Sequence, residues 1–373
     1  MHLPLKNLKV LDLSRVLAGP FCGMTLGDLG ANVIKVERPV DGDDTRLWGP
    51  PFDDRGQSAY FLSINRNKLS IALDFRLATD MVLLHALIAQ ADVVIENYLP
   101  SALARFGVHA SAKLVEHSRL IWCTISGFGP LSTRPGYDFV LQAESGWMSI
   151  TGPEAGPPMR TGVALIDVLA GKDAVTAILA ALLHRDTPDA NRAIHISLAD
   201  SAAAALVNVA QNTLVSELDA RRWGNAHPNL VPYQLFAASD RPFVIAVGTD
   251  RQWRAAANAL DLHGLADDHT LFTNAGRIAH RERLIAAMSE RLASQTALHW
   301  IQRLDMAGVP CGMVRSVREA LNGTMASSKT GVPSSVGGQI RYAPPVLDEH
   351  GLLIRTKNWS AFDHVPILDS QDV

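Results

Sequence analysis

The sequence predicts an α/β protein, with a mostly parallel sheet in its first 200 residues and a smaller unit after it. Strand and helix signals alternate along those residues, which is typical of parallel sheets joined by crossover helices. The composition then changes, and 373 residues are enough for two domains. Hydrophobic residues make up 47% of the chain and charged residues 19%, a balance that indicates a well-buried enzyme rather than a disordered protein.

Six apolar runs bounded by turn residues predict the strands of the sheet region. The expected strands are residues 8–13, 32–37, 69–74, 92–96, 120–126 and 193–198. Helices are expected at 20–29 and 78–90, and over the alanine-rich run after Leu198. Pro20 fits the first turn of its helix, where the missing N–H would have no partner in any case.

After residue 200 the pattern predicts a smaller domain and a returning tail. Residues 201–235 are expected to be a linker or active-site loop, because 221–232 is polar and rich in turn residues. A small domain is expected over 236–320, with a strand at 243–247 and helices near 252–260, 277–293 and 296–307. Residues 321–340 are rich in Ser, Gly and Thr and predict a connector. The tail 341–373 has only brief apolar runs, so we expect it to pack onto another domain.

Charge and the lack of certain segments exclude several classes of protein. A net charge of −3 gives no basic balance for nucleic acid, and no apolar stretch of about 18 residues predicts a membrane span. The N-terminus lacks the pattern of a signal peptide. Cys22, Cys123 and Cys311 stand far apart, without a CxxC pair or a companion His at metal spacing. We therefore expect a cytoplasmic, metal-free protein that binds neither nucleic acid nor membrane.

The first strand–helix–strand unit lacks a dinucleotide fingerprint. Residues 14–23 contain no GxGxxG, because only Gly19 and Gly23 are present and Pro20 removes one backbone N–H. Glu37 ends the second strand where a ribose-binding acid would stand, but the turn before it argues against nicotinamide or flavin. A Walker motif, a GxSxG elbow and an HExxH pair are also absent from the sequence.

Asp167 is the most informative single residue. The apolar run 163–166 predicts a short buried strand, and a helix containing Gly171 follows. The N–H groups and dipole of a helix N-terminus would favour the ionised carboxylate. A desolvated carboxylate in a cleft can attack an activated carbonyl. The same pattern fits a helix cap, since Asp is a favoured N-cap residue, and the local sequence leaves both interpretations open.

Several basic residues stand at expected strand ends and loop edges. Arg38 closes the second strand, Arg66 and Lys68 share a loop, Arg76 follows a strand and Arg105 ends a helix-like turn. In a parallel sheet such edges are where an anionic ligand binds. The alternative interpretation is ordinary surface charge.

Many segments in order resemble one family, the class III CoA-transferases of the formyl-CoA transferase and carnitine CoA-transferase type. They begin with Val10-Leu-Asp-Leu-Ser-Arg-Val-Leu-Ala-Gly-Pro20 and end with Ala307-Gly-Val-Pro-Cys-Gly312. Between these lie Leu26-Gly-Asp-Leu-Gly-Ala-Asn-Val-Ile-Lys-Val-Glu-Arg-Pro39, Gly42-Asp-Asp-Thr-Arg46, Asn65-Arg-Asn-Lys68, Asp92-Val-Val-Ile-Glu-Asn97, Gly127-Phe-Gly-Pro130, Pro135-Gly-Tyr-Asp138, Gln142-Ala-Glu-Ser-Gly146, the run from Gly162 to Gly171, and Gly224-Asn-Ala-His-Pro-Asn.

The resemblance implies a site and a fold. The family's catalytic aspartate falls on Asp167. Its CoA-contacting positions fall on Val16, Leu17, Arg38, Leu73, Arg76, Asn97 and Arg105. The three arginines among them would then face the phosphates and adenine end of coenzyme A. The implied fold is a large Rossmann-like domain of residues 1–200 and the tail, a smaller α/β domain, and an interlocked homodimer. Acyl-CoA and coenzyme A would be substrates, with no tightly bound cofactor.

The resemblance also implies an activity with two alternatives. The activity is transfer of CoA from an acyl-CoA, such as succinyl-CoA, to a free carboxylic acid through aspartyl anhydride and aspartyl-CoA intermediates. The α-methylacyl-CoA racemase branch is one alternative, but it uses a His where this chain has Tyr137. A Tyr, with a pKa of about 10, is a poor substitute. A CoA-binding protein without catalysis is the other alternative, which the presence of Asp167 disfavours.

The acceptor acid is suggested by one segment and by two departures. Residues 224–233 resemble relatives that act on dicarboxylates, so Arg46, Arg160 and His227 are candidates to pair with a distal carboxylate. Leu17 replaces a glutamine of formyl-CoA transferase, and Pro135 stands where that enzyme has a lysine. The departure at Leu17 argues against formate or oxalate chemistry, and Arg134 next to Pro135 is the nearest substitute for the lysine.

Overall fold

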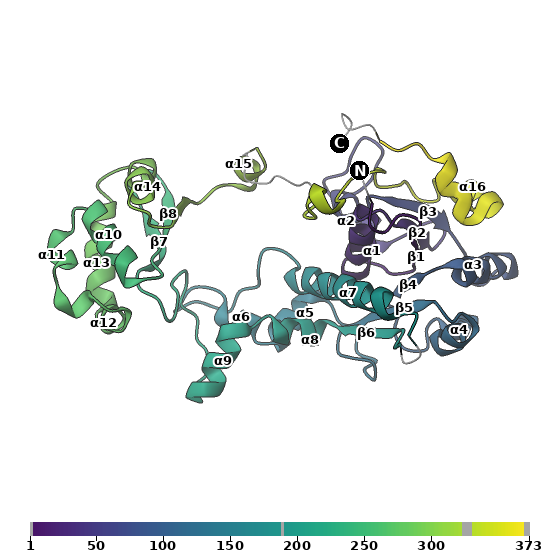
Figure 1. Cartoon of the computed structure of the whole chain (residues 1–373), viewed down its shortest axis with the longest axis horizontal. Helices are drawn as coiled ribbons and strands as arrows, with labels where there is room; N and C mark the ends of the chain where they lie inside the picture. Colours follow the sequence, from purple (N-terminus) through teal and green to yellow (C-terminus); the bar gives the residue numbers. More distant parts are fainter. Residues whose placement is uncertain (1–2, 188–189, 323–329, 369–373) are drawn as a thin grey trace. The chain divides into compact units, whose positions relative to one another are not determined.

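The computed structural model describes residues 3–187, 190–322 and 330–368, and these divide into two compact units. The larger unit comprises described residues of 1–148, 160–219 and 328–373. The smaller unit comprises those of 149–159 and 220–327. Figure 1 shows the elements of each unit coloured along the chain.

Six strands of the larger unit form one parallel sheet in the order β3-β2-β1-β4-β5-β6 (Figure 1). Their bounds are β1 Lys9–Asp12, β2 Asn32–Glu37, β3 Lys68–Ala72, β4 Val93–Glu96, β5 Ile121–Ser126 and β6 Ala193–Ser197. Chain order reverses between β1 and β4. In open α/β sheets the carboxyl ends of the strands at such a reversal are where ligands bind.

Helices cover both faces of this sheet, so its central strands are buried on both sides. One face carries α1 Ala18–Asp28, α5 Asp138–Glu144, α7 Leu165–His184 and α8 Leu198–Ala204. The opposite face carries α3 Ala78–Gln90, α4 Ala110–Glu116, α16 Gly351–Lys357 and the 3₁₀ helix η5 Asn358–His364. Strands covered in this way typically consist of nearly continuous apolar residues, as β4 does, whereas β2 also carries the buried Lys35 and Glu37. No helix among the described residues is long and apolar enough to cross a membrane.

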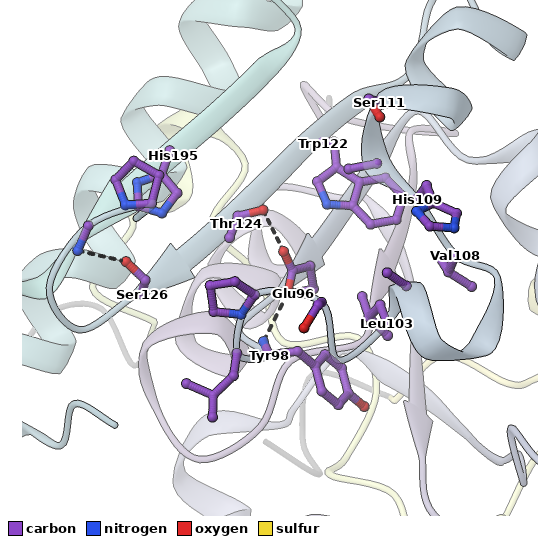
Figure 2. A pocket seen from close by; sticks show the side chains of 17 residues that line it. Glu96, Tyr98, Leu103, Val108, His109, Ser111, Trp122, Thr124, Ser126 and His195 are labelled. Carbon is purple, nitrogen blue, oxygen red and sulfur yellow. Dashed lines mark hydrogen bonds between the residues drawn. The ribbon is translucent and has the colours of Figure 1, made fainter. Parts of the chain in front are cut away.

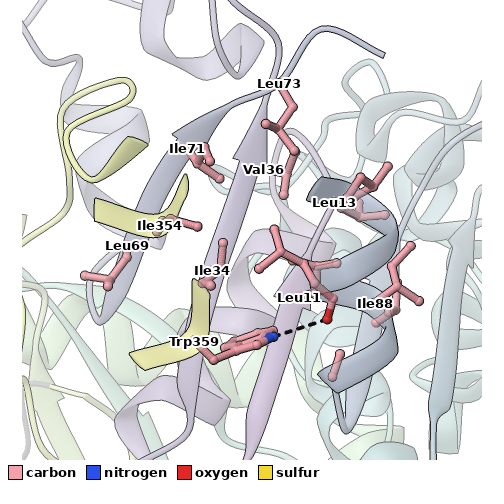
Figure 3. Close-up of a cluster of buried hydrophobic side chains, with 14 of the residues drawn as sticks. Leu11, Leu13, Ile34, Val36, Leu69, Ile71, Leu73, Ile88, Ile354 and Trp359 are labelled. Carbon is pink, nitrogen blue, oxygen red and sulfur yellow. Dashed lines mark hydrogen bonds between the residues drawn. The ribbon is translucent and has the colours of Figure 1, made fainter. Parts of the chain in front are cut away.

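Two apolar cores lie on the two faces because successive strand side chains point in opposite directions. Val10 packs beneath α1 and α7, whereas its neighbour Leu11 packs on the side of α3. Figure 3 shows this second core, in which Ile354 and Trp359 from the C-terminal part lie against β1, β2 and β3. The tail therefore completes the core of the larger unit.

Polar contacts also fix the returning tail. The backbone N–H groups of Arg341 and Tyr342 both donate to the side-chain oxygen of Asn67. The guanidinium of Arg341, which is buried, donates to the carbonyls of Gly27 and Ala31. The indole N–H of Trp359 donates to the carbonyl of Leu87 at 3.2 Å. These contacts join residues that are about 270 to 310 positions apart in the sequence.

The smaller unit consists of an antiparallel sheet packed against helices. Its strands are β7 Tyr233–Ala237, β8 Pro242–Ala246 and β9 Cys311–Met313. Its helices are α10 Asp250–Ala259, α11 His263–Ala266, η3 His269–Leu271, α12 Asn274–Ala279, α13 Arg281–Leu292 and α14 Ala297–Met306. Trp253 and Trp300 are fully buried in its core. The remaining elements of the chain are η1 Asp44–Leu47, α2 Ala59–Ile64, η2 Ala104–Phe106, α6 Trp147–Ile150, α9 Val207–Ser216, α15 Val317–Leu321 and η4 Ser334–Val336.

The structure corrects several sequence-based boundaries. Residues 201–235, expected to be a linker, contain most of α8, all of α9 and the start of β7, and 201–219 belong to the larger unit. Residues 149–159, expected in the large domain, belong to the smaller unit. The single helix expected over 277–293 is broken at His280, which leaves the helical region and ends α12. Part of the expected connector, 323–329, lies outside the described residues.

Replacing Trp359 with Ala is predicted to lower the free energy of unfolding of the larger unit by about 3–5 kcal/mol, because a buried indole leaves a cavity in the core. Leu352→Ala on the same tail is the matched control, because Leu352 is 80% exposed. That variant should differ from wild type by no more than about 0.5 kcal/mol. Equal denaturation midpoints for both variants would contradict the role of the tail in the core.

Candidate active site

A cavity of about 220 Å³ lies at the carboxyl edge of the sheet, where the strand order reverses. The loops that follow β1, β4 and β5 form most of its wall, and the first turn of α7 contributes Asp167. The lining residues are Arg15, Val16, Leu17, Ala18, Asn97, Tyr98, Leu99, Pro100, Ile125, Ser126, Gly127, Ser132, Arg134, Pro135, Gly136, Tyr137, Asp167 and Leu198. All of them belong to the larger unit.

A second cavity of about 420 Å³ adjoins the first on the other side of the loop after β4. The two share Tyr98, Leu99, Pro100 and Ser126 in their walls. Figure 2 shows Glu96 in this second cavity, where its carboxylate accepts hydrogen bonds from the Thr124 hydroxyl and the Tyr98 backbone N–H. Burial raises the pKa of Glu96.

The loop between β1 and α1 holds an unusual backbone conformation. Val16 has a φ of 70°, which is strained for a β-branched residue. The side-chain amide of Asn97 makes two hydrogen bonds to the backbone of Arg15, the residue before Val16. It accepts from the Arg15 N–H at 2.9 Å and donates to the Arg15 carbonyl at 2.7 Å. The Val16 N–H donates to Asp43 at 3.3 Å. The side chain of Asn97 therefore helps to hold the conformation of this loop.

A buried ionic network supports the same loop from below. The ammonium of Lys35 on β2 donates to Asp43 at 2.9 Å and to the Ser14 carbonyl at 3.0 Å. Burial alone would raise the pKa of Asp43, but Lys35 and the hydrogen bonds from Thr45 outweigh it and lower the pKa to about 2. The two charges are completely buried, and each has a partner.

A second buried ion pair lies beside the first. The ammonium of Lys68 on β3 donates to Asp12 at the end of β1 and to the carbonyl of Pro20 in α1, both at 2.8 Å. Burial lowers the pKa of Lys68 to about 8, although the charge of Asp12 opposes that shift. This pair ties the start of α1 to the sheet, and the Lys35–Asp43 pair ties the loop before α1 to it.

Asp167 is the third residue of α7 and only 8% exposed. Its position differs from the expectation in two ways. The apolar run 163–166 forms no strand. Val163 is exposed, and Leu165 and Ile166 are the first two residues of α7. The N-cap residue is Ala164, so Asp167 does not cap the helix.

The ionisation of Asp167 also differs from the expectation. Burial, followed by the neighbouring charge of Asp138, raises the pKa of Asp167 to about 7. The favourable field of the helix N-terminus was expected to keep the carboxylate ionised, but desolvation without a cationic partner has the larger effect. Asp167 is thus a buried carboxyl group poised near neutral pH, which is a property that functional groups often share.

Close packing of two helices brings Asp167 to the start of α1. A Cβ atom on Gly171 would lie 2.7 Å from the carbonyl oxygen of Ala18 and 3.0 Å from the ring of Phe21, so only glycine permits this approach. Leu17 and Ala18 line the cavity, and the N–H groups in the first turn of a helix have no partners within that helix. The cavity thus combines a carboxyl group with a helix N-terminus that favours negative charge.

Comparison with known proteins identifies the family. A profile of CoA-transferase family III matches residues 5–336. The chain is 40% identical over 371 residues to a succinyl-CoA:glutarate CoA-transferase of Mus musculus, covering 93% of this chain and 84% of that protein. It is also 40% identical over 329 residues to a succinate–glutarate CoA-transferase of Agrobacterium fabrum, covering 85% and 81%.

A crystal structure of a CAIB/BAIF family protein from Brucella suis superposes with a TM-score of 0.86 at 38% identity, covering 96% of this chain and all of that one. This chain belongs to CoA-transferase family III. The family expected from the sequence motifs is confirmed, and so is enzymatic transfer of CoA from an acyl-CoA to a carboxylic acid.

The structure brings some of the expected site residues of this CoA-transferase together. Val16, Leu17, Asn97, Tyr137 and Asp167 line the same cavity. The others lie elsewhere in the larger unit, except His227.

Three expected CoA contacts are arginines on the surface. Arg38 pairs with Asp44 at 2.6 Å, and Arg76 is 81% exposed and pairs with Asp74. Arg105 lies in η2 and is exposed. Leu73, by contrast, is buried in the core behind β3.

The three residues expected to bind a distal carboxylate of the substrate lie in different environments. Arg46 is buried and donates from Nε and Nη2 to the two oxygens of Glu37, so its charge is neutralised inside the fold and does not face the cavity. Arg160 is exposed in the segment before α7. His227 belongs to the smaller unit, where burial, followed by the charge of Arg281, lowers its pKa.

Sequence reasoning missed two residues around Asp167. Arg15 lines the cavity, as does Arg134 beside Pro135, and the signal for Arg15 was its place in a quoted motif. Tyr60 on α2 is the second missed residue. Burial, followed by the charges of Asp167, Asp138 and Asp43, raises the pKa of Tyr60 to about 12. No local pattern connects residue 60 with residue 167, so this proximity required the fold.

The variant Asp167→Asn is predicted to be more stable than wild type at pH 8 and equally stable near pH 4. The pKa of Asp167 rises on folding from 3.8 to about 7, so the folded state binds the extra proton between those values and wild type loses stability as pH rises through them. The difference amounts to at most about 4 kcal/mol.

Urea denaturation at several pH values measures this difference. Asp219→Asn, which removes an exposed carboxylate, is the control and should change the free energy of unfolding by no more than about 0.5 kcal/mol at any pH. A difference between Asp167→Asn and wild type that does not vary with pH would show that Asp167 is not a destabilising buried charge.

Proposed function

We propose that Asp167 is the nucleophile that transfers CoA from succinyl-CoA to a small dicarboxylic acid. The observation that supports this role is a buried carboxyl group without a cationic partner among the described residues, in a cavity beside the N-terminus of α1. Structural carboxylates in this fold, such as Asp12 and Asp43, are paired with lysines. Asp167 is left unpaired where a substrate could enter.

In the first half of the reaction the ionised Asp167 attacks the thioester carbonyl of the donor. The C–S bond breaks, CoA leaves as thiolate, and an aspartyl–acyl anhydride remains. The thiolate then attacks the aspartyl carbonyl, so the donor acid leaves as carboxylate and Asp167 becomes a CoA thioester.

The second half repeats these steps with the acceptor. The acceptor carboxylate attacks the aspartyl thioester, which releases CoA thiolate and forms a new anhydride. The thiolate attacks the acceptor carbonyl, so the product acyl-CoA leaves and the carboxylate of Asp167 is regenerated. One thioester is exchanged for another, and the reaction needs no net input of electrons or phosphate.

Each step places negative charge on a carbonyl oxygen near Asp167. The first turn of α1, at Leu17 and Ala18, offers N–H groups and the positive end of a helix dipole at the cavity wall. Arg15 and Arg134 add positive charge to the same wall. Arg38, Arg76 and Arg105 are proposed to bind the phosphates of CoA.

The proposed substrates follow from the relatives. The proteins from Mus musculus and Agrobacterium fabrum are named for transfer between succinyl-CoA or succinate and glutarate. A dicarboxylate needs a cation for its second carboxylate. Arg160 and His227 remain candidates for that contact, together with Arg15 and Arg134.

An interlocked homodimer is part of this proposal. It rests on the family alone, and sedimentation equilibrium is expected to give twice the mass of the 40.3 kDa chain. A monomer at micromolar concentration would contradict it.

Incubation with succinyl-CoA and a panel of carboxylic acids is predicted to give a new acyl-CoA, detected by mass spectrometry, with glutarate among the accepted acids. Asp167→Asn should lose transfer by several powers of ten, because the covalent route disappears. Asp173→Asn is the control and should keep transfer. Asp173 lies on the same helix, and its carboxylate accepts a hydrogen bond from the Ser201 hydroxyl.

Two outcomes would contradict the proposal. Transfer by Asp167→Asn at the wild-type rate would exclude Asp167 as nucleophile. Exchange of deuterium into the carbon next to the thioester, without transfer to any acid, would indicate racemisation instead.

A further inference from the structure

A second carboxylate, Asp138, contacts the start of the helix that carries Asp167. One oxygen of Asp138 accepts the backbone N–H of Ile166 at 2.8 Å, and this N–H belongs to the first turn of α7. Asp138 is buried and lies 28 positions earlier in the sequence, as the first residue of α5. It therefore performs for α7 the capping role that neither Ala164 nor Asp167 performs.

Gln142 extends this contact to the segment before α7. Its amide N–H donates to the other oxygen of Asp138 at 2.6 Å, and its amide oxygen accepts the Thr161 N–H at 2.9 Å. Gln142 is completely buried. Asp138 and Gln142 together hold residues 161–166, which lead directly to Asp167.

Both oxygens of Asp138 thus accept hydrogen bonds from uncharged donors, and no salt bridge among the described residues neutralises it. Its negative charge stands beside Asp167. Other ionisable groups around Asp167 are Tyr60 on α2, Arg15 in the loop before α1, and Arg134 and Tyr137 in the segment before α5. The helices themselves carry Lys172 and Asp173 on α7, Glu144 on α5 and Asp200 on α8. Burial and the charge of Asp138 are the causes that raise the pKa of Asp167.

We propose that Asp138 is a positioning residue that holds the first turn of α7 and, by its charge, disfavours the free carboxylate of Asp167 relative to its uncharged covalent states. The inference rests on the proposed role of Asp167 as nucleophile. Conversion of that carboxylate to an anhydride or thioester removes one of two neighbouring negative charges. The repulsion is relieved in both intermediates, so the free enzyme is the state that Asp138 destabilises.

The double variant Asp138→Asn with Gln142→Glu separates charge from geometry. The new amide at position 138 can still accept the Ile166 N–H, and it can donate its own N–H to the new carboxylate at position 142. That carboxylate can still accept the Thr161 N–H. These three hydrogen bonds and the total charge are kept, but the negative charge moves one side chain further from Asp167. Only the long hydrogen bond from the Gln142 amide to the Val163 carbonyl, at 3.5 Å, is lost. Asp138→Ala removes both the contact with Ile166 and the charge.

The experiment titrates Asp167 in protein labelled with ¹³C-aspartate, read by carboxyl NMR, with Asp167→Asn used to assign its signal. In the double variant the titration midpoint of Asp167 should fall by about one pH unit, the lower end of the effect of a nearby like charge. The pH midpoint of transfer should fall with it. Asp138→Ala should lower kcat at every pH, and Asp173→Asn should leave the midpoint of Asp167 unchanged.

The outcomes distinguish this inference from the proposed function. The titration needs no substrate, so it is informative even if Asp167 proves not to be the nucleophile. An unchanged midpoint in the folded double variant would overturn the role of the Asp138 charge. A wild-type kcat in Asp138→Ala would overturn its positioning role.

Discussion

The buried ion pair between Lys35 and Asp43 is the interaction on which the active-site geometry depends. Lys35 comes from β2, next to the edge strand β3, and its ammonium contacts both Asp43 and the carbonyl of Ser14. Asp43 in turn accepts the N–H of the strained Val16. Removing either charge would leave the other buried and unpaired, which typically costs roughly 3–5 kcal/mol. The loop that forms one cavity wall is thus supported by the interior of the sheet.

The contrast between this pair and Asp167 explains how one fold keeps some carboxylates structural and leaves one reactive. Asp12, Asp43 and Glu37 are each paired with a buried cation. Asp167 is also buried but faces Asp138 instead, and its pKa rises to about 7. A carboxylate that is costly to ionise gains most from forming a neutral covalent bond. The glycine at 171 lets this group approach the N-terminus of α1, where the charge that develops on a substrate oxygen can be stabilised.

Much of the sheet was predictable because its signals are local. The expected bounds of β2 and α3 match the structure, and β2 lies between the turn residues Gly30 and Pro39. The strand expected before Asp167 was wrong, because a short apolar run can precede a helix as readily as form a strand. Arg46 could not be assigned from its motif alone, since only the fold shows that Glu37 occupies its guanidinium.

The features that set the chemistry of Asp167 are long-range. The contact between Asp138 and Ile166 spans 28 residues, and the proximity of Asp167 to Tyr60, whose pKa the charge of Asp167 helps to raise, spans about 100. Neither leaves a local pattern. The raised pKa also depends on what is missing near Asp167 among the described residues, namely a paired cation, and sequence spacing does not report this.

Peptide mapping by mass spectrometry, after brief incubation with succinyl-CoA and acid quench, tests the central claim most directly. The account predicts a CoA adduct on the peptide that contains Asp167, absent from Asp167→Asn and discharged when an acceptor acid is added before the quench. A CoA adduct on another residue, or rapid transfer without any adduct at Asp167, would contradict it.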